Sequence, residues 1–102
     1  MATIMVVRIQ SDVDPEELER RAIERRPEFK KIPGLVQKIY GRNDETGDWC
    51  GIYFFESRQA LAAFRESELA KTIPTAYEAT DVRREVYELM YSLHPGRGPF
   101  NE

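Results

Sequence analysis

The chain is poor in the residues from which disulfide frameworks and metal centres are built. It has one cysteine, Cys50, and one histidine, His94, among 102 residues. A single thiol forms no intrachain disulfide, and no paired Cys or His spacing of a zinc site occurs. We therefore expect a reducing compartment, a small buried Cys50 and no metal site. His94 would be the natural base or haem ligand, but it adjoins a Pro/Gly-rich segment and we interpret it as solvated.

Long apolar runs and a strong excess of charge are also missing. No stretch approaches the roughly 20 apolar residues that a membrane-spanning helix requires. Residues 1–5 lack the charged start and the long apolar run of a signal peptide. The formal net charge is only -3, so strong attraction to nucleic acid or to an anionic membrane is not expected. We expect a cytoplasmic protein with neither a nucleic acid nor a membrane as its partner.

What the chain does contain is centred on a hairpin. Residues 35–42 and 49–56 read as two strands around a turn at 43–47, where Gly47 can take the positive φ that closes it. In the second strand, alternation places Trp49, Gly51, Tyr53 and Phe55 on one side and the side chains between them on the other. Both sides are apolar. The sequence leaves open which side faces a ligand pocket.

Further elements flank this hairpin. Residues 3–10, rich in β-branched side chains, predict a central strand. The run Asp14-Pro15-Glu16-Glu17 predicts a helix start with a capping box, and the helix should stop or kink near Arg26, before Pro27. A second helix is expected at residues 58–70 and a fourth strand at 84–93. Residues 76–81 fit either a helical turn or a loop.

The order β-α-β-β-α-β predicts an α+β, ferredoxin-like domain: a four-stranded antiparallel sheet with helices on one face. We place this single domain at residues 1–94 and a C-terminal tail at 95–102. Two helices cover one face of such a sheet, yet the predicted strands are apolar on both faces. A patch of that size is rarely left exposed by a monomer. We therefore expect a homodimer formed by sheet-to-sheet packing.

Several short motifs around the hairpin carry a family resemblance. They are Pro33-Gly34-Leu35, Lys38, Tyr40, Glu45-Thr46-Gly47, Gly51-Ile52-Tyr53-Phe54-Phe55, Ser57, Ala60, Ala63 and Phe64. This set resembles the YdhR-type monooxygenases, part of the antibiotic-biosynthesis-monooxygenase-like group of dimeric α+β barrel proteins. The resemblance implies a barrel closed by two sheets, with a pocket in each subunit between sheet and helices. Similar proteins include some that oxidise polycyclic aromatic compounds with O₂ and no cofactor, some that degrade haem and others that act as isomerases.

Cofactor-free oxygenation needs a pocket that holds a flat aromatic molecule, stabilises its anion and excludes water. We assign catalytic roles to Trp49, Arg8 and Tyr53. We assign substrate binding to Tyr40, Lys38, Tyr87 and Phe64. Each polar or aromatic member also has a structural interpretation, such as strand packing, a dimer interface, or a cation that reaches water past an apolar surface.

The leading hypothesis is therefore a cofactor-independent monooxygenase acting on a small hydrophobic or aromatic compound. Two alternatives use the same fold. One is a non-catalytic small-ligand-binding or interaction module, and the other is a small isomerase or cyclase. An oxygenase consumes O₂, an isomerase turns over without it, and a binding module retains affinity without turnover.

Overall fold

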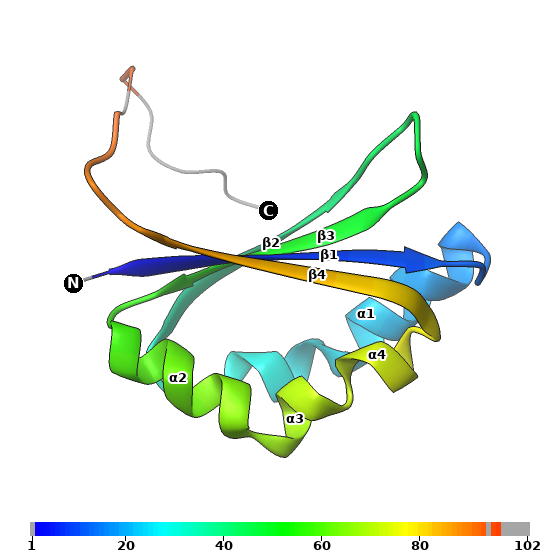
Figure 1. The fold of residues 1–102 in the computed structure, drawn as a ribbon, viewed down its shortest axis with the longest axis horizontal. Coiled ribbons are helices and arrows are strands. Elements are labelled where there is room, and N and C mark those ends of the chain that lie inside the picture. Colours follow the sequence, from blue (N-terminus) through cyan, green and yellow to red (C-terminus); the bar gives the residue numbers. More distant parts are fainter. Residues whose placement is uncertain (1, 94, 97–102) are drawn as a thin grey trace.

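The computed structural model describes residues 2–93 and 95–96. The elements in chain order are β1 (Thr3–Ser11), α1 (Pro15–Lys30), β2 (Leu35–Arg42), β3 (Trp49–Phe55), α2 (Arg58–Glu66), α3 (Glu68–Lys71), α4 (Ile73–Ala76) and β4 (Ala79–Glu88). The sheet order is β2-β3-β1-β4, with every neighbouring pair antiparallel. Figure 1 shows all the helices on one side of the sheet. The predicted ferredoxin-like order is confirmed, whereas His94 and residues 97–102 lie outside the described residues.

The first helix begins at Pro15 with Asp14 as its cap, as predicted, but the Glu17 carboxylate accepts from Arg20 and Arg21 instead of completing the expected capping box, and the helix ends later than expected. The Asp14 carboxylate accepts a hydrogen bond from the Glu16 backbone N–H at 3.1 Å, which satisfies one free donor of the first turn. The expected end near Arg26 is wrong, because α1 continues through Pro27 to Lys30. Proline removes only one hydrogen bond of the ladder. Burial of Phe29, which is 3% exposed, holds the last turn against the core.

The second half of the chain departs further from the prediction. The single helix expected at residues 58–70 is divided at Ser67, whose hydroxyl donates to the Phe64 carbonyl at 2.6 Å and accepts from the Ala70 N–H at 3.2 Å. The fourth strand runs from Ala79 to Glu88 rather than over 84–93. The neighbouring strand β1 starts at Thr3, which pairs with Glu88. Strand β4 therefore ends at Glu88, because β1 offers no residue for it to pair with beyond that point.

The core lies between the sheet and the helices. Its centre is a set of four packed rings with centroid separations of 5.4 to 6.4 Å: Phe29, Tyr53, Phe55 and Phe64. Directly paired residues of neighbouring strands share a face, so Met5 and Val7 of β1 join Tyr53 and Gly51 of β3 on this side. Burial of these apolar side chains is the main stabilising contribution to the domain.

The other face of the sheet, here called the open face, carries no helix (Figure 1). Strand register places these apolar side chains on it: Ile4, Val6, Ile39, Ile52, Phe54 and Tyr87. Tyr87 is 49% exposed. The apolar character expected of both faces is therefore present, and the homodimer that was expected to cover this face stays a prediction. Within the described residues, no helix is both long and apolar enough to cross a membrane.

Candidate functional site

Two connected spaces lie on the helix side of the sheet. The first, here called the inner cavity, has a volume of about 40 Å³ and lies between the sheet, α1 and the α4 segment. The second, the outer hollow, has a volume of about 730 Å³ and lies between α1 and the edge strand β2. Ala22, Lys38, Tyr40 and Trp49 line both spaces. The inner cavity has room for a few water molecules, whereas the outer hollow has room for a small organic molecule.

Lys38 is the central polar group of this site. Its Nζ lies 3.6 Å from the ring centroid of Phe29, 4.3 Å from that of Tyr40 and 4.6 Å from that of Tyr53. We call these three rings the aromatic cage. Among the described residues, no carboxylate lies within ion-pair distance of Lys38. Burial, with a smaller contribution from the Arg25 guanidinium, lowers the pKa of Lys38 from 10.5 to about 7.

Gly51 leaves the space that Lys38 occupies. A Cβ at this position would lie 3.1 Å from Lys38 Cε and 3.2 Å from a Tyr53 ring carbon. Tyr53 pairs with Lys38 across the β2–β3 ladder, and Gly51 pairs with Tyr40. Because Gly51 of β3 has no side chain, the long side chain of Lys38 on β2 can lie over the sheet.

Tyr77 is a site residue that the sequence analysis missed. It is 8% exposed, and its ring lines the inner cavity. Its hydroxyl is buried beside the Arg25 guanidinium, which interacts with it, but it makes no well-formed hydrogen bond to a described residue. Burial raises the pKa of Tyr77, and Arg25, whose guanidinium lies 5.7 Å from the ring centroid, opposes part of that rise. An unpaired buried hydroxyl is costly, so the Tyr77 hydroxyl would gain a hydrogen bond from any ligand or water molecule that reached it.

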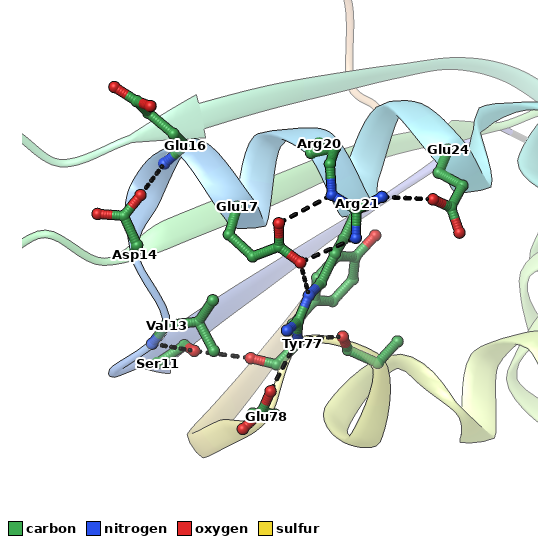
Figure 2. A network of polar contacts seen from close by, with 11 residues as sticks. Ser11, Val13, Asp14, Glu16, Glu17, Arg20, Arg21, Glu24, Tyr77 and Glu78 are labelled. Carbon is green, nitrogen blue, oxygen red and sulfur yellow. Dashed lines mark hydrogen bonds and ion pairs between the residues drawn. The ribbon is translucent and has the colours of Figure 1, made fainter.

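A polar network fixes the segment that carries Tyr77 (Figure 2). Arg21 of α1 donates to Glu17 at 2.9 Å, to Glu78 at 2.9 Å and to the Ala76 carbonyl at 3.1 Å. The Ser11 hydroxyl, at the end of β1, donates to the Tyr77 carbonyl at 2.7 Å. The α4 segment is therefore held to both α1 and β1, on either side of the inner cavity. Arg21 and Glu17 lie four residues apart on α1, so this ion pair spans one turn of the helix.

The structure brings together four of the seven predicted site residues. Lys38, Tyr40, Trp49 and Tyr53 line the inner cavity. The side of β3 that faces the helices is therefore the side of Trp49, Gly51 and Tyr53, which answers the question left open by the sequence. Burial raises the pKa of Tyr40 to about 12 and that of Tyr53 further, so both phenols stay protonated near neutral pH.

The other three predicted residues lie elsewhere. Arg8 lies on the open face, where its Nε is 3.9 Å from an Asp48 carboxylate oxygen. Tyr87 lies on the same face and donates to Glu85 at 3.0 Å. Phe64 is 4% exposed and packs beneath Tyr53 without lining either space. Within one chain, Arg8 and Tyr87 are on the wrong side of the sheet to share a site with Trp49.

The arrangement suits chemistry on a weakly acidic apolar molecule. An amine with a low pKa accepts a proton near neutral pH, and protonated phenols donate hydrogen bonds to a developing oxyanion. The apolar surroundings strengthen both interactions. The described residues contain no cluster of three or more His, Cys, Asp or Glu side chains that could hold a metal ion.

Comparisons with known proteins agree with this architecture. The family described as "Putative mono-oxygenase ydhR" matches residues 4–95. No curated protein sequence matches the chain. Among solved structures, similarity extends to SnoaB, a cofactor-independent oxygenase from Streptomyces nogalater, with a TM-score of 0.75 and 17% identity over 90% of this chain and 96% of SnoaB.

Two further solved structures have the same fold, with similar TM-scores. Rv0793 from Mycobacterium tuberculosis has a TM-score of 0.74 and 14% identity over 92% of this chain and all of that protein. A Deinococcus radiodurans protein, described as a putative antibiotic biosynthesis monooxygenase, has a TM-score of 0.70 and 11% identity over 92% of this chain and 97% of its own. At these identities the likeness establishes the fold alone.

Proposed function

The chain belongs to the ydhR mono-oxygenase family, and from this premise we propose that it oxygenates a small aromatic compound with O₂, using Lys38 as the base. The observation that carries the proposal is the half-buried Lys38, whose amine lies among the rings of the aromatic cage with no carboxylate within ion-pair distance among the described residues. The fold it shares with a protein named as a cofactor-independent oxygenase supports the same choice.

The proposed reaction starts with proton transfer. Neutral Lys38 removes a proton from a CH₂ group that lies between two aromatic rings and beside a phenol or carbonyl, as in an anthrone. The carbanion transfers its electrons to O₂ and forms a C–O bond, which gives a peroxide anion. Lys38 returns the proton, and the hydroperoxide loses water to leave a ketone. One oxygen atom enters the product and the other leaves as water, so the substrate supplies all the electrons.

Other residues of the site have supporting roles in this proposal. The outer hollow holds the aromatic substrate against Trp49 and Tyr40, which line it. The phenols of Tyr53 and Tyr77 stabilise the oxyanion of the deprotonated substrate by hydrogen bonds. The rings around Lys38 keep water away from the carbanion, which water would otherwise protonate again.

Oxygen uptake with a panel of anthrones and polycyclic quinols tests the proposal. We expect uptake to fall by about 10²-fold or more in Lys38→Met, the range typical of losing a general base. Lys31→Met is the matched control, because Lys31 is an exposed lysine that faces only Glu28, and it should keep the wild-type rate. Binding without oxygen uptake would instead support a ligand-binding module, and anaerobic turnover would support an isomerase.

The proposed enzyme is a homodimer that packs through the open face. Its support is the apolar surface left without a helix, formed by residues such as Val6, Ile52 and Phe54. Arg8 and Tyr87 then belong to this interface rather than to the pocket of their own chain. Light scattering tests it: the wild-type chain should have twice the monomer mass of 11.9 kDa, and Phe54→Glu should be monomeric. A wild-type monomer at micromolar concentration contradicts it.

A further inference from the structure

The surroundings of Lys38 also favour a chemistry that needs no oxygen: we propose that its amine captures aromatic aldehydes as an imine. The three requirements are a neutral amine, a proton donor for the departing oxygen, and a dry space that fits an aromatic ring. Each is met by a different part of the site. The proposal does not depend on the oxygenase reaction, although it uses the same lysine.

The first requirement separates Lys38 from the other lysines of the chain. An amine attacks a carbonyl carbon only through its unprotonated nitrogen. Lys30, Lys31 and Lys71 are exposed, and the Lys31 amine also lies 3.9 Å from a Glu28 carboxylate oxygen. Lys38 has no such partner, and its burial disfavours the charge. At neutral pH, Lys38 is therefore the lysine with the largest fraction of nucleophilic amine.

The second requirement is met by Tyr77. When the amine of Lys38 adds to an aldehyde, the carbonyl oxygen becomes a hydroxyl. This hydroxyl leaves as water when the C=N bond forms, and the two hydrogens of that water come from the amine. A donor that lends a proton to the departing oxygen and then regains one speeds this step. Tyr77 lines the same inner cavity as Lys38, and its buried hydroxyl, which makes no well-formed hydrogen bond to a described residue, is the donor that we assign to this step.

The third requirement is met by the two spaces together. The outer hollow of about 730 Å³ takes the aryl group, with Trp49 and Tyr40 along it. The inner cavity of about 40 Å³ has room for the water molecule that is released. The cage rings of Phe29, Tyr40 and Tyr53 shield the C=N bond from bulk water, which would hydrolyse it.

Trapping with borohydride is the direct test. The protein is incubated anaerobically at pH 7 with 2-hydroxy-1-naphthaldehyde and then reduced with sodium borohydride, and its mass and peptide map are recorded. We expect one adduct per chain, located on Lys38. Lys38→Arg should lose this adduct, and Lys31→Arg should keep it. Equal labelling of Lys30, Lys31 and Lys71, or an unlabelled Lys38, would overturn the proposal.

A second variant tests the role of Tyr77 as the proton donor. Tyr77→Phe keeps the ring and removes only the hydroxyl, so the pocket shape is preserved. We expect imine formation, followed by its absorbance, to be at least tenfold slower, while the final extent of labelling at Lys38 stays the same. An unchanged rate would overturn the role of Tyr77. Because no O₂ is present, a failure of imine capture and a failure of the oxygenase reaction are seen in separate assays.

Discussion

Replacing Lys38 by methionine should stabilise the protein while it removes the proposed base. The lysine amine is confined by the aromatic cage, without an acidic partner in the described part of the chain, and its burial lowers its pKa from 10.5 to about 7. At about 1.36 kcal/mol per pKa unit, that difference corresponds to a cost of about 5 kcal/mol for the charged form in the folded state. Methionine is similarly long, unbranched and apolar and carries no charge to desolvate, so we expect a gain of about 4 kcal/mol at pH 7.

The stability that Lys38→Met gains over the wild type depends on pH. The folded-state pKa of Lys38 is below its unfolded value, so the unfolded chain binds more protons between the two values. The stability of the wild type therefore rises with pH from about 7 towards 10.5. The advantage of Lys38→Met is largest at pH 7 and below, and it disappears as the pH approaches 10.5.

Urea unfolding at several pH values measures this effect, at one protein concentration because association shifts apparent stability. Lys31→Met controls for the loss of one exposed lysine and should change stability by less than about 0.5 kcal/mol. If Lys38→Met is less stable than the wild type at pH 7, or if its advantage does not shrink at higher pH, the amine is not desolvated and the reasoning is refuted.

The remaining predictions concern the glycines and the pH profile. Gly51→Ala should keep the fold but displace Lys38, because the added Cβ would lie 3.1 Å from Lys38 Cε. Oxygen uptake should therefore be slower than in the wild type, and an equal rate would contradict this. Gly34→Ala should destabilise by about 3 kcal/mol, since it combines a φ of +80° with a Cβ only 2.5 Å from that of Ala60. Gly47→Ala, with the same φ in open space, should cost about 1 kcal/mol in the same urea assay; equal costs would show that the Ala60 contact is unimportant. Oxygen uptake should rise with pH through the midpoint of Lys38, since only its neutral form accepts a proton, and a flat profile would exclude it as the base.

Local patterns were sufficient to predict the order of elements and the turn of the hairpin. Asp14 and Ser57 cap the helices that follow them, and Gly47 closes the hairpin turn. Each of these residues acts on backbone only a few positions away, so its effect is visible in the sequence. The limits of β4 depend instead on where β1 begins, which is set by pairing between distant segments. For the same reason, the end of α1 depends on Phe29 reaching the core rather than on Pro27.

The candidate site was only partly predictable for a related reason. A cation within an apolar strand drew attention to Lys38, and alternation grouped Trp49 with Tyr53. Arg8 pairs with Cys50 in the β1–β3 ladder, so it lies on the opposite face from Trp49, and that register is not visible in either strand alone. Tyr77 was missed because residues 76–81 have no clear periodicity. The four-residue spacing from Ile73 to Tyr77, typical of one helix face, was the signal available.

The central claim is that the Lys38 amine is desolvated and has a large neutral fraction near pH 7. Nuclear magnetic resonance titration of the lysine side chains measures this directly, with Lys30, Lys31 and Lys71 as references in the same molecule. We predict a midpoint for Lys38 of about 7, roughly three pKa units below that of an exposed lysine, the equivalent of about 4 kcal/mol. A midpoint indistinguishable from theirs would contradict the proposed base and the proposed aldehyde capture together.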